Sequence, residues 1–131
     1  MSVRALAFFP CEMLLADPET QAASAINIIE DVTFARFPGG FGRLSLFAML
    51  ERESAENLNE KVSIDIKISF NGAQVGSQKQ DVVFPGNARK TKVRLFMNGL
   101  GIQTPGTVVF ELAHDGKTIA TYNVQASAPQ A

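Results

Sequence analysis

The feature that most constrains this chain is the nearly perfect alternation of hydrophobic and polar residues over positions 61–70. One set of alternate positions is hydrophobic throughout and consists of Val62, Ile64, Ile66, Ile68 and Phe70. Because successive side chains of a strand point to opposite faces of a sheet, this stretch predicts a strand with one buried face. Asn71-Gly72 follows directly, and this pair tolerates the positive φ angles of a type I′ turn. The chain should therefore fold back as a hairpin through residues 74–78.

The second half of the chain repeats this pattern. Residues 90–98 alternate in the same manner, so that one face is expected to point inward, with Thr91, Val93, Leu95 and Met97. The opposite face carries Lys90, Lys92, Arg94 and Phe96. Further along, Asp115-Gly116 is another turn pair, which predicts a second hairpin between strands at 107–113 and 117–124.

The first half of the chain is more apolar. Residues 3–15, 25–34 and 44–51 are near-continuous apolar runs, which are typical of central strands covered on both faces or of strands at a dimer contact. One sandwich would not fully cover such strands, so we expect self-association or a protein partner. The residues expected to form that contact are Leu6, Phe8, Phe41 and Phe47.

Two other segments are connections. Residues 53–59 could form a short surface helix or a loop, because the segment is polar with good helix formers but covers only about two turns. Residues 37–42, rich in Pro and Gly, predict a loop. About eight or nine short strands separated by turn signals indicate a single all-β domain over residues 1–131. The expected architecture is an antiparallel β-sandwich of immunoglobulin-like or jelly-roll type, with a closed β-barrel as the alternative.

Size and charge restrict the classes of function. A chain of 131 residues supports one buried core, and a net charge of −1 gives no global field that would gather nucleic acid or anionic membrane. Nucleic acid is therefore not the expected partner. No apolar run approaches the roughly 18 residues that span a bilayer. The apolar stretch at 5–9 is shorter than the ~7 to 15 residues of a secretion signal, so we expect a cytoplasmic protein.

The residues that could carry chemistry are few. His114 is the only His and Cys11 the only Cys, which is half of a tetrahedral ligand set, so we expect neither a metal site nor a cofactor. A Cys11/His114 pair oriented by Glu12 or Asp115 would define a small hydrolase, an alternative function that we keep. The simpler interpretation makes Cys11 a small buried hydrophobe and His114 an exposed hairpin residue.

Three pairs of carboxylates offer a second route to the hydrolase alternative. They are Glu30-Asp31, Glu51/Glu53 and Glu56/Glu60. Adjacent strand residues point to opposite faces and cannot share a substrate, whereas Glu51 and Glu53 could share a face. Solvation of the end of a strand and of the following loop is the favoured interpretation of Glu51 and Glu53.

The strongest local charge signal is the outward face of residues 90–98. Strand spacing places Lys90, Lys92 and Arg94 about 7 Å apart, with Phe96 at the end, a geometry that could bind an acidic ligand or stack a base. A solvated strand face, or protection of a sheet edge against other chains, explains the same residues. A ring-stacking binder of sugars or peptides is disfavoured because the chain has no Trp and only Tyr122 as tyrosine.

Four segments are distinctive: ALAFFPCE at 5–12, SAINIIE at 24–30, Phe37-Pro38 and LFAML at 46–50. In these segments the chain resembles an uncharacterised family of small bacterial conserved hypothetical proteins. The closing stretch PGTVVFEL at 105–112, with Asp115-Gly116, is similar to the last hairpin of many β-sandwich modules. The resemblance implies a bacterial cytoplasmic protein of unknown function and supplies no catalytic residues. Together these observations favour a non-enzymatic interaction or structural module.

Overall fold

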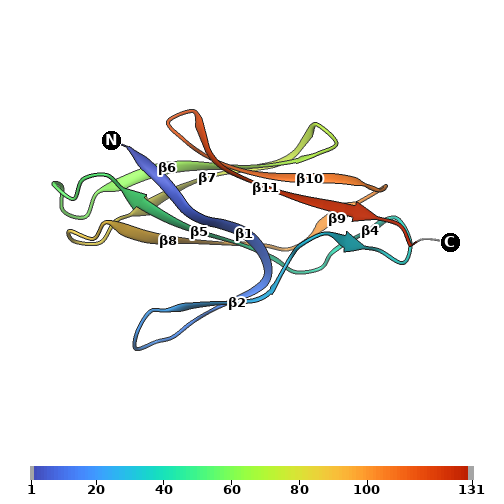
Figure 1. The fold of residues 1–131 in the computed structure, drawn as a ribbon, viewed down its shortest axis with the longest axis horizontal. Helices are drawn as coiled ribbons and strands as arrows, with labels where there is room; N and C mark the ends of the chain where they lie inside the picture. Colours follow the sequence, from blue (N-terminus) through green and yellow to red (C-terminus); the bar gives the residue numbers. More distant parts are fainter. Residues whose placement is uncertain (1, 130–131) are drawn as a thin grey trace.

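The computed structural model describes residues 2–129 and folds them into strands, turns and loops, with no helix in that range (Figure 1). The strands are β1 (Val3–Ala16), β2 (Ala23–Ile28), β3 (Val32–Thr33), β4 (Gly39–Phe41), β5 (Leu44–Arg52), β6 (Lys61–Phe70), β7 (Ala73–Val83), β8 (Lys90–Met97), β9 (Leu100–Ile102), β10 (Gly106–His114) and β11 (Lys117–Ser127). The all-β prediction is confirmed.

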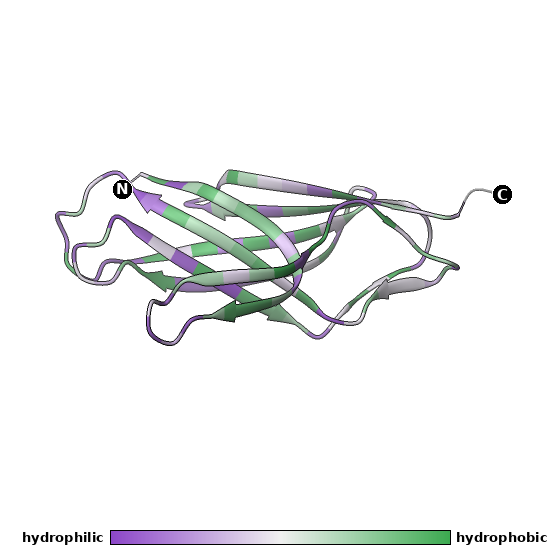
Figure 2. Cartoon of the chain, turned by 60° about the horizontal axis from the view of Figure 1, so that its bottom comes forward, coloured by the Kyte–Doolittle hydropathy of each residue, from purple (hydrophilic) through white to green (hydrophobic). Residues whose placement is uncertain are grey.

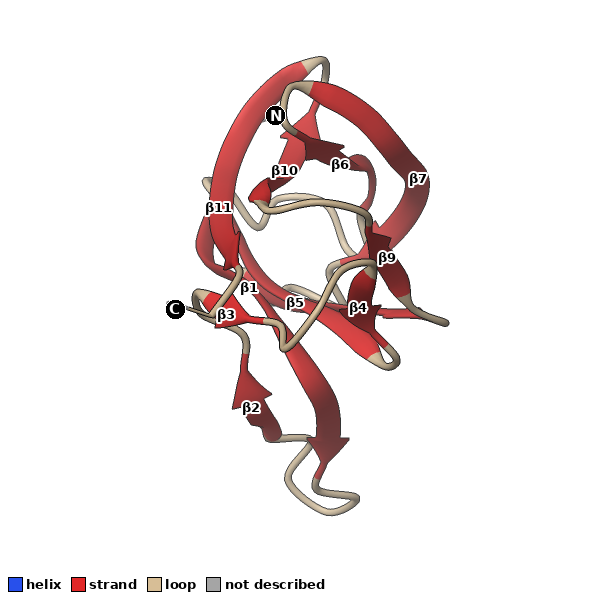
Figure 3. Ribbon diagram, turned by 90° about the vertical axis from the view of Figure 1, so that its right-hand side faces the viewer, coloured by secondary structure: helices blue, strands red, loops and turns tan. Residues whose placement is uncertain are grey.

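The strands form two main sheets and a small ribbon. The first sheet has the order β2-β1-β5-β8 and the second the order β3-β11-β10-β6-β7, while β4 and β9 pair with each other. All pairs are antiparallel except the short β3–β11 pair. Figure 3 shows both sheets curving around a shared interior, so the architecture is a sandwich bent toward a half-barrel. Strands β8 and β7 are each the last strand of their sheet.

The core lies between the two sheets. Its fully buried members come mainly from the central strands and include Leu44, Leu50, Ile64, Val108, Phe110 and Leu112. Apolar and polar segments alternate along the ribbons in Figure 2, as the periodicity of residues 61–70 predicts. Both predicted hairpin turns are present: φ is 48° at Asn71 and 87° at Gly72, and 52° at Asp115 and 75° at Gly116. Positive φ at both central residues is the signature of a type I′ turn.

The prediction for residues 25–34 is wrong. This run is not one central strand but contributes to β2 and β3, which are edge strands of two different sheets. Asn27 has a φ of 54°, yet β2 stays paired with β1 as far as Ile28. The backbone N–H of Ile29 then donates to the carbonyl of Pro10 at 2.9 Å before the chain leaves the first sheet. Residues 44–51, by contrast, lie in β5, which is buried over most of both faces, as expected for a central strand.

The apolar first strand has an explanation within the chain itself. β1 pairs with β5 as far as Cys11 and then continues with β2 as a protruding hairpin, which we call the arm (Figure 3). Leu14, Ala23 and Ala25 of the arm belong to a second apolar cluster with Phe9 and Phe47. The arm therefore covers part of the face of the first sheet that points away from the core.

This packing contradicts the prediction that Leu6, Phe8, Phe41 and Phe47 together form a contact with another chain. Phe8 and Phe47 are buried within the chain, and Phe41 is half-buried beside the core, so these aromatic side chains do not form an exposed dimer surface. Only Leu6 of that set is exposed, next to an irregularity in the pairing of β1. Self-association through other residues stays a prediction.

The structure also shows the conformation of the two connecting segments, 53–59 and 37–42. Residues 53–59 form a loop without a helix. Residues 37–42 are not wholly a loop, because Gly39–Phe41 forms β4 and pairs with β9. The pairing depends on Gly40: a Cβ there would lie 2.5 Å from the carbonyl oxygen of Leu100, so only glycine lets the two backbones approach.

Candidate functional site

The predicted cationic face lies along an edge strand. On β8, Lys90 and Arg94 are exposed, Lys92 is half-buried, and the Phe96 side chain is 67% exposed. In the register with β5, Lys90 lies opposite Glu51 and Lys92 opposite Met49. Arg94 lies opposite Phe47, and Phe96 opposite Ser45. Alternation on β8 puts Val93 and Leu95 into the core and the charged side chains outside. The sequence-based assignment of the two faces therefore agrees with the structure.

Arg89 extends this row of cations at the beginning of β8. We call Arg89, Lys90, Lys92 and Arg94 the cationic strip. Within the described residues 2–129, no member of the strip forms an ion pair. Lys92 donates through Nζ to the carbonyl of Gln21 in the arm, and Arg89 donates through Nη2 to the carbonyl of Glu53 at 2.6 Å. The strip therefore keeps its positive charge without a carboxylate that neutralises it.

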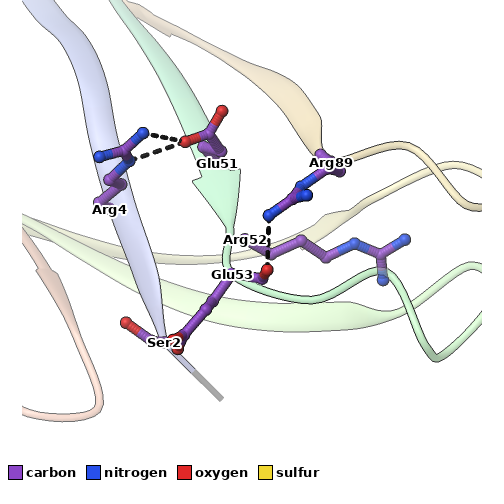
Figure 4. Close-up of a pocket in the computed structure, with 6 residues that line it drawn as sticks. All are labelled: Ser2, Arg4, Glu51, Arg52, Glu53 and Arg89. Atoms are coloured by element: carbon purple, nitrogen blue, oxygen red, sulfur yellow. Dashed lines mark hydrogen bonds and ion pairs between the residues drawn. The ribbon is translucent and has the colours of Figure 1, made fainter.

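A cavity of about 280 Å³ adjoins the strip, where the beginning of β1 lies beside the end of β5 (Figure 4). Its lining consists of Ser2, Arg4, Glu51, Arg52, Glu53 and Arg89. Arg4 donates through Nε to Glu51 Oε1 at 2.7 Å and through Nη2 to the same oxygen. Figure 4 shows that the Arg52 guanidinium points away from this ion pair. Glu51 and Glu53 thus line one cavity, but Glu51 is neutralised by Arg4 and is not positioned as an acid or base.

Arg52 is the residue that the sequence analysis missed. It is fully buried, and its guanidinium donates to the carbonyls of Ala88, Asn57 and Gly86 at 2.8, 2.7 and 3.3 Å. The charge lies 3.4 Å from Glu60 Oε1 and 5.2 Å from the centre of the Phe84 ring.

The signal that could have revealed Arg52 is the alternation of core-facing and outward-facing side chains along β5. Leu44, Leu46, Ala48 and Leu50 all face the core, so Arg52, two residues further, faces it too. A buried charge must find hydrogen-bond partners, and here three carbonyls and one carboxylate supply them. Arg52 ties the 53–60 loop to the β7–β8 connection.

The structure does not bring together the residues of the hydrolase alternative. Cys11 lies on β1 in the first sheet, whereas His114 ends β10 in the second. The Cys11 thiol is fully buried, and burial raises its pKa, which opposes formation of the nucleophilic thiolate. Its sulfur contacts the carbonyl of Met13 at 3.5 Å. Glu12 accepts instead from Asn27 Nδ2 at 2.7 Å.

His114 is buried, so the prediction of an exposed hairpin residue is wrong. The reason is its neighbour strand: His114 is in register with Ile64 of β6, a pairing that the turn sequence does not reveal. Its Nε2 lies 3.6 Å from Asp115 Oδ2. No group of three or more metal-ligating side chains is found among residues 2–129.

Native Cys11 should resist alkylation. In the folded protein at neutral pH, we expect iodoacetamide to react at least about tenfold more slowly than in concentrated urea, because the thiol is buried and its pKa is raised. The measurement is mass spectrometry of the intact chain over time. Equal rates in the two conditions would show that this part of β1 is open to solvent.

In each remaining carboxylate pair, one carboxylate has a structural partner. Asp31 accepts from the backbone N–H of Gln125 at 2.9 Å, and both Glu30 and Asp31 line an open groove together with Glu12. Tyr122 donates to the carbonyl of Ile29 at 2.6 Å, and burial, with the nearby carboxylates of Glu30 and Asp31, raises its pKa. The two carboxylates therefore border one groove, in which Asp31 is held by a backbone hydrogen bond.

The third carboxylate pair lies on the 53–60 loop. Glu56 and Glu60 line a cavity of about 190 Å³, and Glu60 faces the buried guanidinium of Arg52. In the described part of the chain, no helix is long and apolar enough to cross a bilayer.

Comparison with known proteins identifies the fold only. No protein-family model and no curated protein matches the chain. The chain is similar to part of the alkylpurine DNA glycosylase AlkC of Pseudomonas fluorescens, solved bound to DNA containing an abasic site analog, with a TM-score of 0.50 and 14% identity over 92% of this chain and 30% of that chain. A glycosyl hydrolase family 2 member of Bacteroides cellulosilyticus matches at a TM-score of 0.46 and 21% identity over 79% of this chain.

The chain spans 17% of that second protein, so in both cases it corresponds to a minor part of a larger molecule. At such identities the likeness to the first shows a common strand arrangement and says nothing of activity.

Proposed function

We propose that this chain is a non-enzymatic interaction module that binds an acidic protein segment through the cationic strip. The observation that carries the proposal is the row of Lys90, Lys92 and Arg94 along β8, with Arg89 in the turn before it, none of which has an ion-pair partner among residues 2–129. Alternate strand residues lie about 7 Å apart, which matches the spacing of side chains on a second extended chain.

Local charge is what makes this face distinct. The chain as a whole carries −1, yet the strip gathers positive charge on one side of the first sheet, where Glu51 is paired with Arg4. Clustered charge of one sign steers an oppositely charged partner and fixes its orientation. Phe96, exposed at the end of the strip, adds an apolar contact of the kind found at interface centres.

Edge protection is the competing explanation for the same residues. β8 is the last strand of its sheet, and lysines on such strands discourage pairing with other chains. The two explanations differ in their consequences: a protective strip prevents self-association, whereas a binding strip retains an acidic partner.

The strip is tested by removing its charges. We expect Lys90→Ser, Lys92→Ser and Arg94→Ser combined to weaken binding of a fluorescently labelled poly-glutamate peptide by at least about tenfold, or ~1.4 kcal/mol, since each exposed ion pair contributes roughly 0.2–1 kcal/mol. Fluorescence anisotropy at low and high salt measures the affinity, and binding to the unsubstituted protein should weaken as salt rises.

A matched control removes the same number of charges elsewhere. Lys61, Lys67 and Lys117 are exposed on the second sheet, and their combined replacement with Ser should leave poly-glutamate binding unchanged. Equal loss in both triple variants, or no binding to the unsubstituted protein, would contradict the proposal. Tighter, strip-dependent binding of duplex DNA would overturn it in favour of nucleic acid. Self-association of the strip variant, without any poly-glutamate binding by the unsubstituted protein, would establish edge protection.

A further inference from the structure

The strip lies on a strand whose outer edge has no partner strand among residues 2–129. In that range β8 pairs with β5 alone and β7 with β6 alone. The two strands contact each other, so these edges of the two sheets lie side by side. They approach at one end, where Thr91 Oγ1 donates to the carbonyl of Val83 at 2.9 Å. Backbone N–H and C=O groups on an edge strand are available to an added strand from another chain.

Away from that contact, the two edges bound a cavity of about 130 Å³. Its apolar lining consists of Ile66, Ile68, Leu95 and Met97. Ile66 and Ile68 lie on the core face of β6, and Leu95 lies on the core face of β8. The cavity is therefore an opening into the apolar interior between the sheets. An apolar cavity near 150 Å³ can hold a benzene ring, so this one has room for about one hydrophobic side chain.

Strand β7 leaves this space unfilled. Gly76 is in register with Ile68, so its missing side chain would point toward the same core face. A Cβ built at Gly76 meets nothing within 4 Å. Ile68 is thus covered by no side chain from β7 at this position.

The alternation of β8 specifies what could pair with it. A strand added to its edge would carry one set of alternate side chains beside Leu95 and the cavity, and the other set beside Lys92 and Arg94. Opposite charges on neighbouring strands stabilise the pair, and like charges destabilise it. The complementary segment therefore alternates apolar and acidic residues.

We propose that the acidic partner binds as an extended strand along the free edge of β8 and inserts an apolar side chain into the cavity between β7 and β8. This inference rests on the proposed function and adds the mode of binding and the sequence pattern of the partner. The cationic strip supplies orientation, the edge supplies backbone hydrogen bonds, and the cavity supplies selectivity for the apolar positions.

The test compares two labelled peptides of equal length. One is poly-glutamate, and in the other Glu alternates with Val or Leu. We expect the alternating peptide to bind at least about tenfold tighter despite its lower charge, because it buries an apolar side chain and pairs along the edge. The same peptide N-methylated along its backbone should fall to the affinity of poly-glutamate, because it cannot donate hydrogen bonds to β8.

A cavity-filling variant separates this inference from the proposed function. Gly76→Leu should abolish the preference for the alternating peptide while leaving poly-glutamate binding unchanged, which also shows that the variant is folded. The control is Val75→Leu, which enlarges an exposed neighbour on the same strand. No preference in the unsubstituted protein, or a preference that survives Gly76→Leu or N-methylation, would overturn strand addition. In that case, loss of poly-glutamate binding in the variant with Lys90, Lys92 and Arg94 replaced by Ser would still support the cationic strip as the binding site of an acidic segment.

Discussion

Replacing Arg52 with Met should lower the free energy of unfolding by about 3–5 kcal/mol, the cost typical of removing one partner from a buried ionic network. Methionine retains much of the side-chain volume, so the expected decrease in stability comes from lost hydrogen bonds and charge, not from lost packing. The carbonyls of Ala88, Asn57 and Gly86 would lose their charged donor. Urea denaturation followed by circular dichroism provides the measurement.

The matched control is Arg4→Met on the same sheet. The Arg4 side chain is 72% exposed and pairs with Glu51 on the surface, so its replacement should cost at most about 1 kcal/mol. If both variants unfold at the same urea concentration, the Arg52 network contributes no more than a surface ion pair.

The second large effect is expected in the core. Phe110→Ala should lower the free energy of unfolding by about 3–5 kcal/mol, because the substitution removes a large buried side chain and leaves a cavity between tightly packed strands. Phe110 is fully buried at the centre of the second sheet, in register with Ile68 and Tyr122. The urea midpoint should fall with an unchanged slope if only stability is affected.

Phe96→Ala provides the comparison for this effect. It deletes the same side chain from an exposed position on β8 and should change stability by no more than about 0.5 kcal/mol. A large loss at Phe96 would mean that it is covered by another part of the protein or by a second copy. Such a result would revive the self-association that the apolar strands first suggested.

The Arg52 network lies next to the beginning of the cationic strip. Arg52 connects the 53–60 loop to the turn before β8, and Arg89 in that turn donates to the carbonyl of Glu53. The buried network therefore positions the beginning of the cationic strip. We expect the Arg52→Met variant to lose order there first, since loops held by few contacts open before the core.

Side-chain periodicity and turn residues determined β6, β8 and the two hairpin turns. Residues 61–70 and the Asn71-Gly72 turn appear in the structure with the same bounds, because alternation and positive-φ pairs act over neighbouring residues. The outward placement of Lys90 and Arg94 on β8 follows from the same local rule.

Partners distant in sequence were decided only by the tertiary structure. Arg52 finds its acceptors at residues 57, 86 and 88, His114 is buried by pairing with β6, and the arm covers Phe47. Strand order also places β8 at an edge beside β7, which creates the opening next to Gly76. Periodicity states which face of a strand is buried but not which strand lies beside it, since that choice depends on how all the faces pack together.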